Sequence, residues 1–134
     1  MEHAWESPVR RRLRESQPVF GCTITTTSLD AAARAATAGF HFLWLELEHS
    51  PLTLETVRHI VLATRDLPAV PFARVPLTER WTAKGVLDAG VQGVVFPFVS
   101  TPDLARRPAP ASRPPAGRNP TATATPPTAT SSSP

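Results

Sequence analysis

Two carboxylates and an imidazole fall within four residues of this chain, in the segment Glu46–His49. They follow an apolar segment, residues 42–47, that we expect to be a buried strand. Charged groups at the end of a buried strand cost free energy unless they are paired or used. The C-terminal ends of parallel strands are also where α/β folds place their chemistry, and imidazole suits proton transfer near neutral pH. A solvated loop with one satisfied histidine is the alternative.

Two more charged residues lie at the ends of predicted elements. Arg74 ends a β-rich segment, where it could simply be the ion-pair partner of Glu46 or Glu48. Asp88 falls within a turn of a predicted helix C-terminus, which is an unfavourable place for an anion. Its alternative is a surface or capping role.

Predicted strands and helices alternate along the chain. The strands are expected over residues 19–25, 40–48, 69–75 and 93–99, and the helices over 29–38, 54–65, 78–87 and from 101 onward. Ser28, Thr53 and Thr78 are the expected helix caps. This alternation indicates a parallel sheet, either an open α/β sheet or a (β/α)₈ barrel. The first strand is followed by no glycine-rich phosphate loop, so a dinucleotide-binding fold lacks its fingerprint.

Composition narrows the functional classes. Residues 1–104 hold ten basic and eleven acidic residues, whereas residues 105–134 hold four arginines and no acid. The net charge of +3 therefore comes from the tail, and nucleic acid is not an expected partner. Cys22 is the single cysteine, which excludes an internal disulfide framework and predicts a reducing, cytoplasmic location. No apolar run approaches the 18 or so residues of a membrane span, so a membrane is not expected either.

The two ends of the chain differ from its middle. Residues 1–18 form a lead segment with an arginine cluster, Arg10–Arg12 and Arg14, and interleaved acids favour a solvated helix over a transit peptide. Residues 19–104 form the predicted α/β part. Residues 105–134 are rich in Pro, Ala and Thr and hold none of the large apolar residues, so we expect a disordered tail, with a Pro-rich linker or docking segment as the alternative.

The ordered motifs of residues 20–104 resemble the HpcH/HpaI aldolase family, which are class II pyruvate aldolases on a (β/α)₈ barrel. The motifs that carry the resemblance are Ala38–Phe40, Glu46–Leu52, Ala73–Pro76, Leu87–Val95 and Pro97. The family usually reads Asp-x-Glu-His-Gly-Pro, so Glu46 and Ser50 depart from its pattern. Residues 112–118 show a fainter resemblance to the family's Arg-Tyr-Pro-Pro-x-Gly-Arg turn, without the tyrosine.

This resemblance implies cleavage or formation of a carbon–carbon bond through a pyruvate enolate, with a 2-oxo acid and an aldehyde as small-molecule partners. It gives His49 the role of a base working through metal-bound water. Asp88 matches the carboxylate that orients this histidine and raises its basicity, and Arg74 the cation that stabilises the enolate oxygen. Each role is chemically reasonable, since a fixed guanidinium aimed at new negative charge is a strong catalytic device.

The resemblance also implies a divalent metal, Mg²⁺ or Mn²⁺, held by a Glu and an Asp from later strands. No acid follows Asp103, so we expect this chain to lack the metal ligands and to be inactive alone. The fold class that follows is the first half of a (β/α)₈ barrel, about four parallel strands, with open edges at its first and fourth strands. The alternative function is a non-enzymatic half barrel that pairs with another chain. A homo-oligomer is compatible with either.

Overall fold

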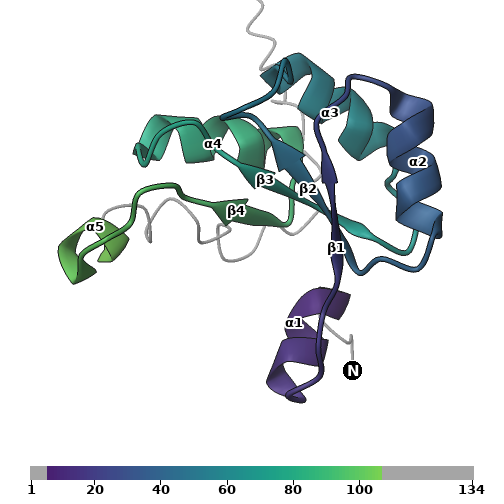
Figure 1. Cartoon of the computed structure of the whole chain (residues 1–134), viewed down its shortest axis with the longest axis horizontal. Coiled ribbons are helices and arrows are strands. Elements are labelled where there is room, and N and C mark those ends of the chain that lie inside the picture. Colours follow the sequence, from purple (N-terminus) through teal and green to yellow (C-terminus); the bar gives the residue numbers. More distant parts are fainter. Residues whose placement is uncertain (1–5, 107–134) are drawn as a thin grey trace, which may run out of the picture.

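The computed structural model describes residues 6–106 (Figure 1). Strands and helices alternate after a first helix, as the sequence predicts. In chain order the elements are α1 (Pro8–Arg14), β1 (Gly21–Ile24), α2 (Leu29–Thr37), β2 (Phe42–Glu46), α3 (Leu54–Ala63), β3 (Val70–Arg74), α4 (Arg80–Ala89), β4 (Gly93–Val95) and α5 (Pro102–Arg106). None of these helices is long and apolar enough to cross a membrane.

The four strands form one parallel sheet in the order β1-β2-β3-β4. Helices α2, α3 and α4 all lie against the same face of this sheet (Figure 1). Side chains at alternate positions of β2 point into the layer between sheet and helices, where Leu43 and Leu45 are fully buried. Val57 and Ile60 of α3 and Val86 of α4 close the same core. Burial of this apolar layer is the main force that holds the helices on the sheet.

Two of the three predicted helix caps are confirmed. The Ser28 hydroxyl accepts the N–H of Ala31 at 3.2 Å, and the Thr53 hydroxyl accepts the N–H of Thr56 at 3.2 Å. These bonds satisfy N–H groups that a helix leaves free in its first turn. The helices α2 and α3 therefore begin where the sequence predicts.

The third predicted cap, Thr78, is wrong. Its hydroxyl instead donates to the carbonyl of Pro97, which ties the loop after β3 to the loop after β4. Helix α4 begins two residues later, at Arg80, with Glu79 at its N-cap position, and it runs two residues beyond the predicted end. Gly90 terminates it with φ +104°, a left-handed conformation that glycine adopts without a side-chain clash.

The fourth strand is much shorter than the predicted 93–99. Its pairing with β3 ends at the register pair Arg74 and Val95, because the chain then reaches Pro97, which has no N–H to donate. Phe98 follows with φ +55° and a side chain that is 77% exposed, so the expectation that it is a core residue is also wrong.

Aromatic side chains line the sheet face opposite to α2, α3 and α4. The rings of Phe42 and Phe72 pack with their centroids 5.2 Å apart. Each ring also lies over a glycine of a neighbouring strand: a Cβ atom on Gly21 would meet the Phe42 ring at 2.3 Å, and one on Gly93 would meet the Phe72 ring at 2.8 Å. The two glycines thus make room for the aromatic floor beneath the polar residues described next.

Both chain ends bear on the predicted domain boundaries. The lead segment contains the expected exposed helix, α1, with only Val9 buried in it. Helix α5 continues through Arg106, two residues past the predicted boundary at 104. The rest of the predicted disordered tail, residues 107–134, lies outside the described residues, as do residues 1–5.

Candidate active site

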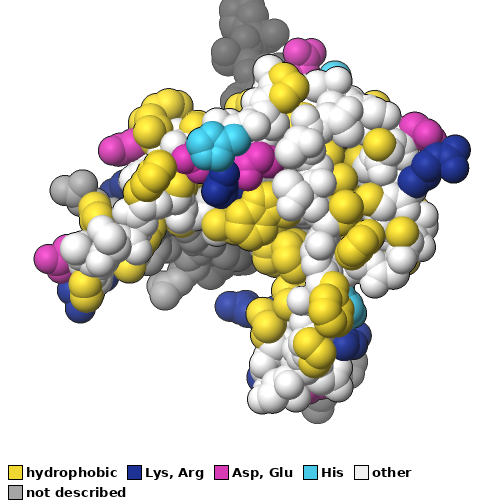
Figure 2. Space-filling view, in the orientation of Figure 1, with side chains coloured by type: hydrophobic (Ala, Val, Ile, Leu, Met, Phe, Trp, Pro, Cys, Tyr) yellow, Lys and Arg dark blue, Asp and Glu magenta, His cyan; other side chains and the backbone are white. Residues whose placement is uncertain are grey.

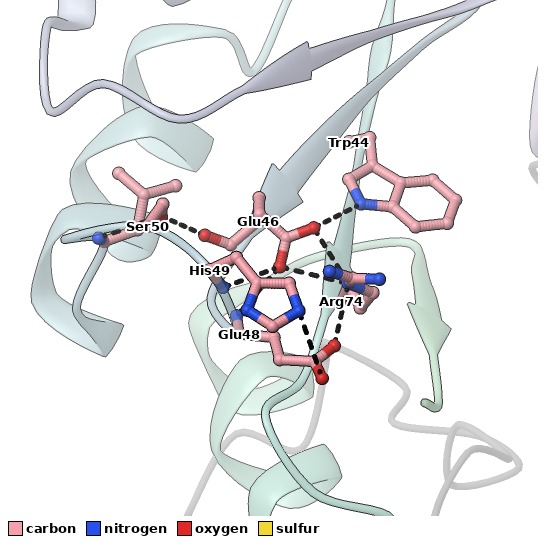
Figure 3. A network of polar contacts seen from close by, with 7 residues as sticks. Trp44, Glu46, Glu48, His49, Ser50 and Arg74 are labelled. Carbon is pink, nitrogen blue, oxygen red and sulfur yellow. Dashed lines mark hydrogen bonds and ion pairs between the residues drawn. The ribbon is translucent and has the colours of Figure 1, made fainter. Parts of the chain in front are cut away.

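The candidate site lies where β2 and β3 end side by side. Glu46 is the last residue of β2 and Arg74 the last of β3, and the two are register partners across the sheet. Glu48, His49 and Ser50 follow in the loop that leads to α3 (Figure 3). In the surface view, histidine, basic and acidic side chains gather at one place beside a hydrophobic area (Figure 2).

Glu46 is the centre of the polar network. Its Oε1 atom accepts the backbone N–H groups of Glu48 at 2.9 Å and His49 at 3.2 Å. Its Oε2 atom accepts the indole N–H of Trp44 at 3.2 Å. Arg74 Nε lies 3.0 Å from Oε1 and 2.8 Å from Oε2. This carboxylate therefore shapes the loop and fixes the arginine at the same time.

The pKa of Glu46 reflects two opposing effects. Burial raises the pKa, because a charged carboxylate is poorly solvated in the protein interior. The hydrogen bonds from Arg74, the loop N–H groups and the indole lower it by more. The net pKa lies below its ordinary value, so Glu46 is ionised at neutral pH and is unsuited to act as a general acid.

Glu48 supplies a second carboxylate to the same arginine. Its side chain is 9% exposed, and its Oε2 atom lies 3.2 Å from Arg74 Nε. This oxygen is buried, yet it has no hydrogen-bond partner among the described residues. Two buried carboxylates thus face one guanidinium, an arrangement that favours the approach of a further positive or proton-donating group.

His49 lies at the solvent-facing edge of this cluster. Its side chain is 70% exposed, and Nε2 lies 3.4 Å from Oε1 of Glu48. Its backbone is held by Glu46, as described above, so the position of the imidazole is set by the buried part of the network. An accessible imidazole beside a carboxylate can exchange protons with a molecule that enters from solvent.

Ser50 secures the end of the loop. Its hydroxyl donates to the carbonyl of Glu46 and accepts the N–H of Leu52 at 3.1 Å. The residue that departs from the family pattern at this position therefore has a structural task of its own, since it closes the turn between β2 and α3.

Arg74 is held at one edge only. Its side chain is 25% exposed, and its contacts with both carboxylates run through Nε. Within residues 6–106 neither Nη atom has a hydrogen-bond partner. The simple ion pair with Glu46 or Glu48 is confirmed, with both of them. It leaves the outer edge of the guanidinium available for an anion.

Asp88 is the one predicted site residue that the structure does not bring to the others. It lies on an exposed face of α4, where its Oδ2 atom pairs with Nζ of Lys84 at 2.6 Å. The pair joins positions one helical turn apart, which is the spacing at which helix side chains meet. The carboxylate in contact with His49 is instead that of Glu48.

The described residues do not form a metal centre. Across residues 6–106 there is no group of three or more His, Cys, Asp or Glu side chains arranged to hold a metal ion. In Glu46, moreover, the carboxylate oxygens are already committed to N–H donors. The residues on hand therefore do not fit the divalent metal that the resemblance implies.

The remaining histidines and Cys22 behave as expected. His41 accepts the N–H of Phe20 through Nδ1 at 3.0 Å, His59 is exposed, and His3 lies outside the described residues. Cys22 is half-buried against the core. None of them joins the site.

Sequence reasoning did not single out Trp44 and Glu48 as site residues. The signal that could have found Trp44 is the alternation of a strand, which places Trp44 and Glu46 on the same face of β2. For Glu48 the signal is weaker, because its contacts depend on the path of the loop.

Comparison with known proteins agrees with this geometry. Residues 20–122 match the family model described as HpcH/HpaI aldolase/citrate lyase, which reaches beyond the region of resemblance seen in the sequence. The chain is 38% identical over 103 residues to a hydroxypyruvate/pyruvate aldolase of Paraburkholderia phytofirmans, covering 75% of this chain and 40% of that protein. It is 34% identical over 112 residues to a 2-keto-3-deoxy-L-rhamnonate aldolase of Shigella sonnei, covering 83% and 42%.

A solved structure shows the same fold. The crystal structure of an HpcH/HpaI aldolase/citrate lyase family protein from Burkholderia cenocepacia J2315 matches with a TM-score of 0.76 and 33% sequence identity. The match covers 83% of this chain and 44% of that one. The chain thus spans less than half the length of the relatives it matches.

Proposed function

Because the chain belongs to the HpcH/HpaI aldolase/citrate lyase family, we propose that its site takes part in carbon–carbon lyase chemistry on 2-oxo acids through a pyruvate enolate. The observation that carries the proposal is Arg74, which two buried carboxylates hold by Nε while its Nη edge stays free beside His49. Relatives named as aldolases for hydroxypyruvate or pyruvate and for 2-keto-3-deoxy-L-rhamnonate support this substrate class. A cytoplasmic setting is part of the same proposal.

In the proposed reaction a 4-hydroxy-2-oxo acid is cleaved between C3 and C4. A base removes the proton of the 4-hydroxyl group, the C–O bond becomes an aldehyde, and the electron pair of the broken bond forms the pyruvate enolate. The enolate then takes up a proton at C3. His49 is the proposed proton carrier, since it is accessible and its partner Glu48 stabilises its charged form.

Arg74 is the proposed electrostatic group. Its free Nη donors would face the carboxylate of the 2-oxo acid and the oxygen on which the enolate charge develops. Glu46 and Glu48 fix the guanidinium in advance, so little reorganisation is needed as the charge forms. No step is routed through a metal ion, because the described residues do not form a site for one.

The role of Asp88 is a proposal that the resemblance alone supports. A pair of variants tests it in any preparation with activity. If Asp88 acts on His49, Asp88→Asn lowers turnover at least tenfold, whereas Lys84→Gln, which only frees the Asp88 carboxylate, does not. Equal rates in the two variants would remove Asp88 from the catalytic set and leave Glu48 as the partner of His49.

The test of the proposed function separates ligand binding from turnover. Pyruvate added to the ¹⁵N-labelled chain should move the Nε–H resonance of Arg74. Arg74→Lys should abolish the response, since a lysine lacks the planar fork, whereas Arg65→Lys is the matched control at an exposed position. We expect no pyruvate release from a 4-hydroxy-2-oxo acid by the chain alone, with or without Mg²⁺ or Mn²⁺. Metal-dependent release would overturn this expectation of inactivity and strengthen the lyase proposal, whereas no pyruvate binding would contradict the lyase proposal.

A second function is favoured by the sheet itself. In the described part of the chain β1 pairs only with β2, and β4 only with β3, so both outer strands have a free edge. Free edges of this kind are templates for pairing with another chain. A non-enzymatic half barrel that associates with a partner would show a stable complex by analytical ultracentrifugation and no response to pyruvate.

A further inference from the structure

Trp44 presents the only side-chain N–H that reaches Glu46 from within the same strand. Trp44 and Glu46 lie on the sheet face opposite to the helices, two residues apart, so their side chains point the same way. The indole Nε1 donates to Oε2 of Glu46 at 3.2 Å (Figure 3). The ring itself is half-buried over the sheet.

The indole bond changes how Glu46 holds Arg74. Arginine and carboxylate frequently pair through two parallel N–H···O bonds, one nitrogen for each oxygen. Here Nε alone lies between the two oxygens, at 3.0 Å from Oε1 and 2.8 Å from Oε2. The second oxygen, which an Nη group would otherwise take, already accepts the Trp44 indole.

The other side of the carboxylate is occupied as well. Oε1 receives the loop N–H groups of Glu48 and His49, so the carboxylate cannot turn to offer a free oxygen there. The indole is therefore the donor that decides whether the remaining lone pairs of Oε2 are filled from β2 or from the Nη edge of Arg74.

We propose that Trp44 is a positioning residue, which acts through Glu46 to keep both Nη groups of Arg74 away from the carboxylate and free to bind an anionic ligand. That this ligand is the carboxylate or enolate of a 2-oxo acid rests on the proposed function; the positioning itself does not. Without the indole N–H, the guanidinium turns toward Oε2, forms the usual two-bond pair and loses one of its two free nitrogens.

The sharpest variant replaces Trp44 by β-(3-benzothienyl)alanine, in which sulfur stands in place of the indole N–H and the ring shape is kept. Trp44→Phe is the simpler second variant. Trp81→Phe is the matched control, because Trp81 lies 69% exposed on α4 and makes no contact with the site in the described part of the chain.

The first measurement needs no ligand. A two-bond pair hinders rotation about the Nε–Cζ bond of arginine, so ¹⁵N NMR at low temperature distinguishes it from a guanidinium held by Nε alone. We expect averaged Nη resonances for Arg74 in the wild type and in Trp81→Phe, and separate ones in both Trp44 variants. Averaged resonances in the benzothienyl variant would overturn the proposal and leave Trp44 as a packing residue.

The second measurement is a pyruvate titration of the same proteins. We expect both Trp44 variants to bind pyruvate about fivefold more weakly than the wild type, and Trp81→Phe to bind it equally well. If the wild type binds no pyruvate, the proposed function fails while the resonances of Arg74 still decide the role of Trp44. If the wild type and the benzothienyl variant bind pyruvate equally, the positioning role fails while the proposed function stands.

Discussion

Arg74 Nε lies within 3.2 Å of three carboxylate oxygens, of which the two belonging to Glu46, at 2.8 and 3.0 Å, come from the adjacent strand in direct register. This relationship joins the ends of β2 and β3 and sets the loop that carries His49. A guanidinium at this point neutralises two carboxylates that would otherwise repel each other in a poorly solvated place.

Arg74→Ala should destabilise the chain by about 3 kcal/mol, because it leaves two nearly buried carboxylates without their cation. Urea unfolding followed by circular dichroism measures the change. Arg65→Ala, at an exposed position, is the control and should stay within about 0.5 kcal/mol of the wild type. Equal stabilities of the two variants would show that the ion pairs are of little importance for the fold.

Glu46 predicts how stability depends on pH. Its pKa is lower in the folded chain than in the unfolded one, so the stabilisation is present above the unfolded pKa of about 4.3 and is lost as the pH falls through the folded pKa. Glu46→Gln should therefore be less stable at neutral pH and lose less stability on acidification below about pH 4.5. Thermal unfolding between about pH 2.5 and 7 tests this, and parallel curves for wild type and variant would contradict it.

Ser50→Ala should cost about 1 kcal/mol, because it removes the hydroxyl that bonds both the Glu46 carbonyl and the Leu52 N–H. Ser50→Gly should cost more, since glycine also adds conformational freedom to the unfolded chain. Ser100→Ala, in the exposed loop after β4, is the control. Chemical denaturation of the three variants gives the comparison, and a Ser50→Ala variant as stable as the control would contradict the role of Ser50.

Gly93→Ala should destabilise the fold by about 1–3 kcal/mol, because its Cβ atom would lie 2.8 Å from the Phe72 ring. Gly85→Ala should be neutral or stabilising by up to about 1 kcal/mol, since alanine favours a helix and its Cβ meets only a flexible Leu54 methyl group at 3.2 Å. Differential scanning calorimetry distinguishes the two. A Gly93→Ala variant that melts with the wild type would show that Phe72 can move aside at no cost.

Local features of the fold were predictable from the sequence. The caps Ser28 and Thr53 act within their own helices, and the apolar run of β2 needs burial whatever surrounds it. The predicted cap Thr78 and the predicted length of β4 were wrong for one common reason. Thr78 bonds Pro97, a residue 19 positions away, and no local pattern encodes that contact.

The sequence by itself determined which reactive groups this protein has and at which strand ends they lie, because strand alternation and helix caps are local properties of the chain. The tertiary structure decided which of these groups meet. The register of β2 and β3 put Glu46 beside Arg74, and the path of the following loop brought Glu48, rather than Asp88, to His49. Register and loop path depend on the packing of distant segments against a shared core, so they arise only when the whole sheet is assembled.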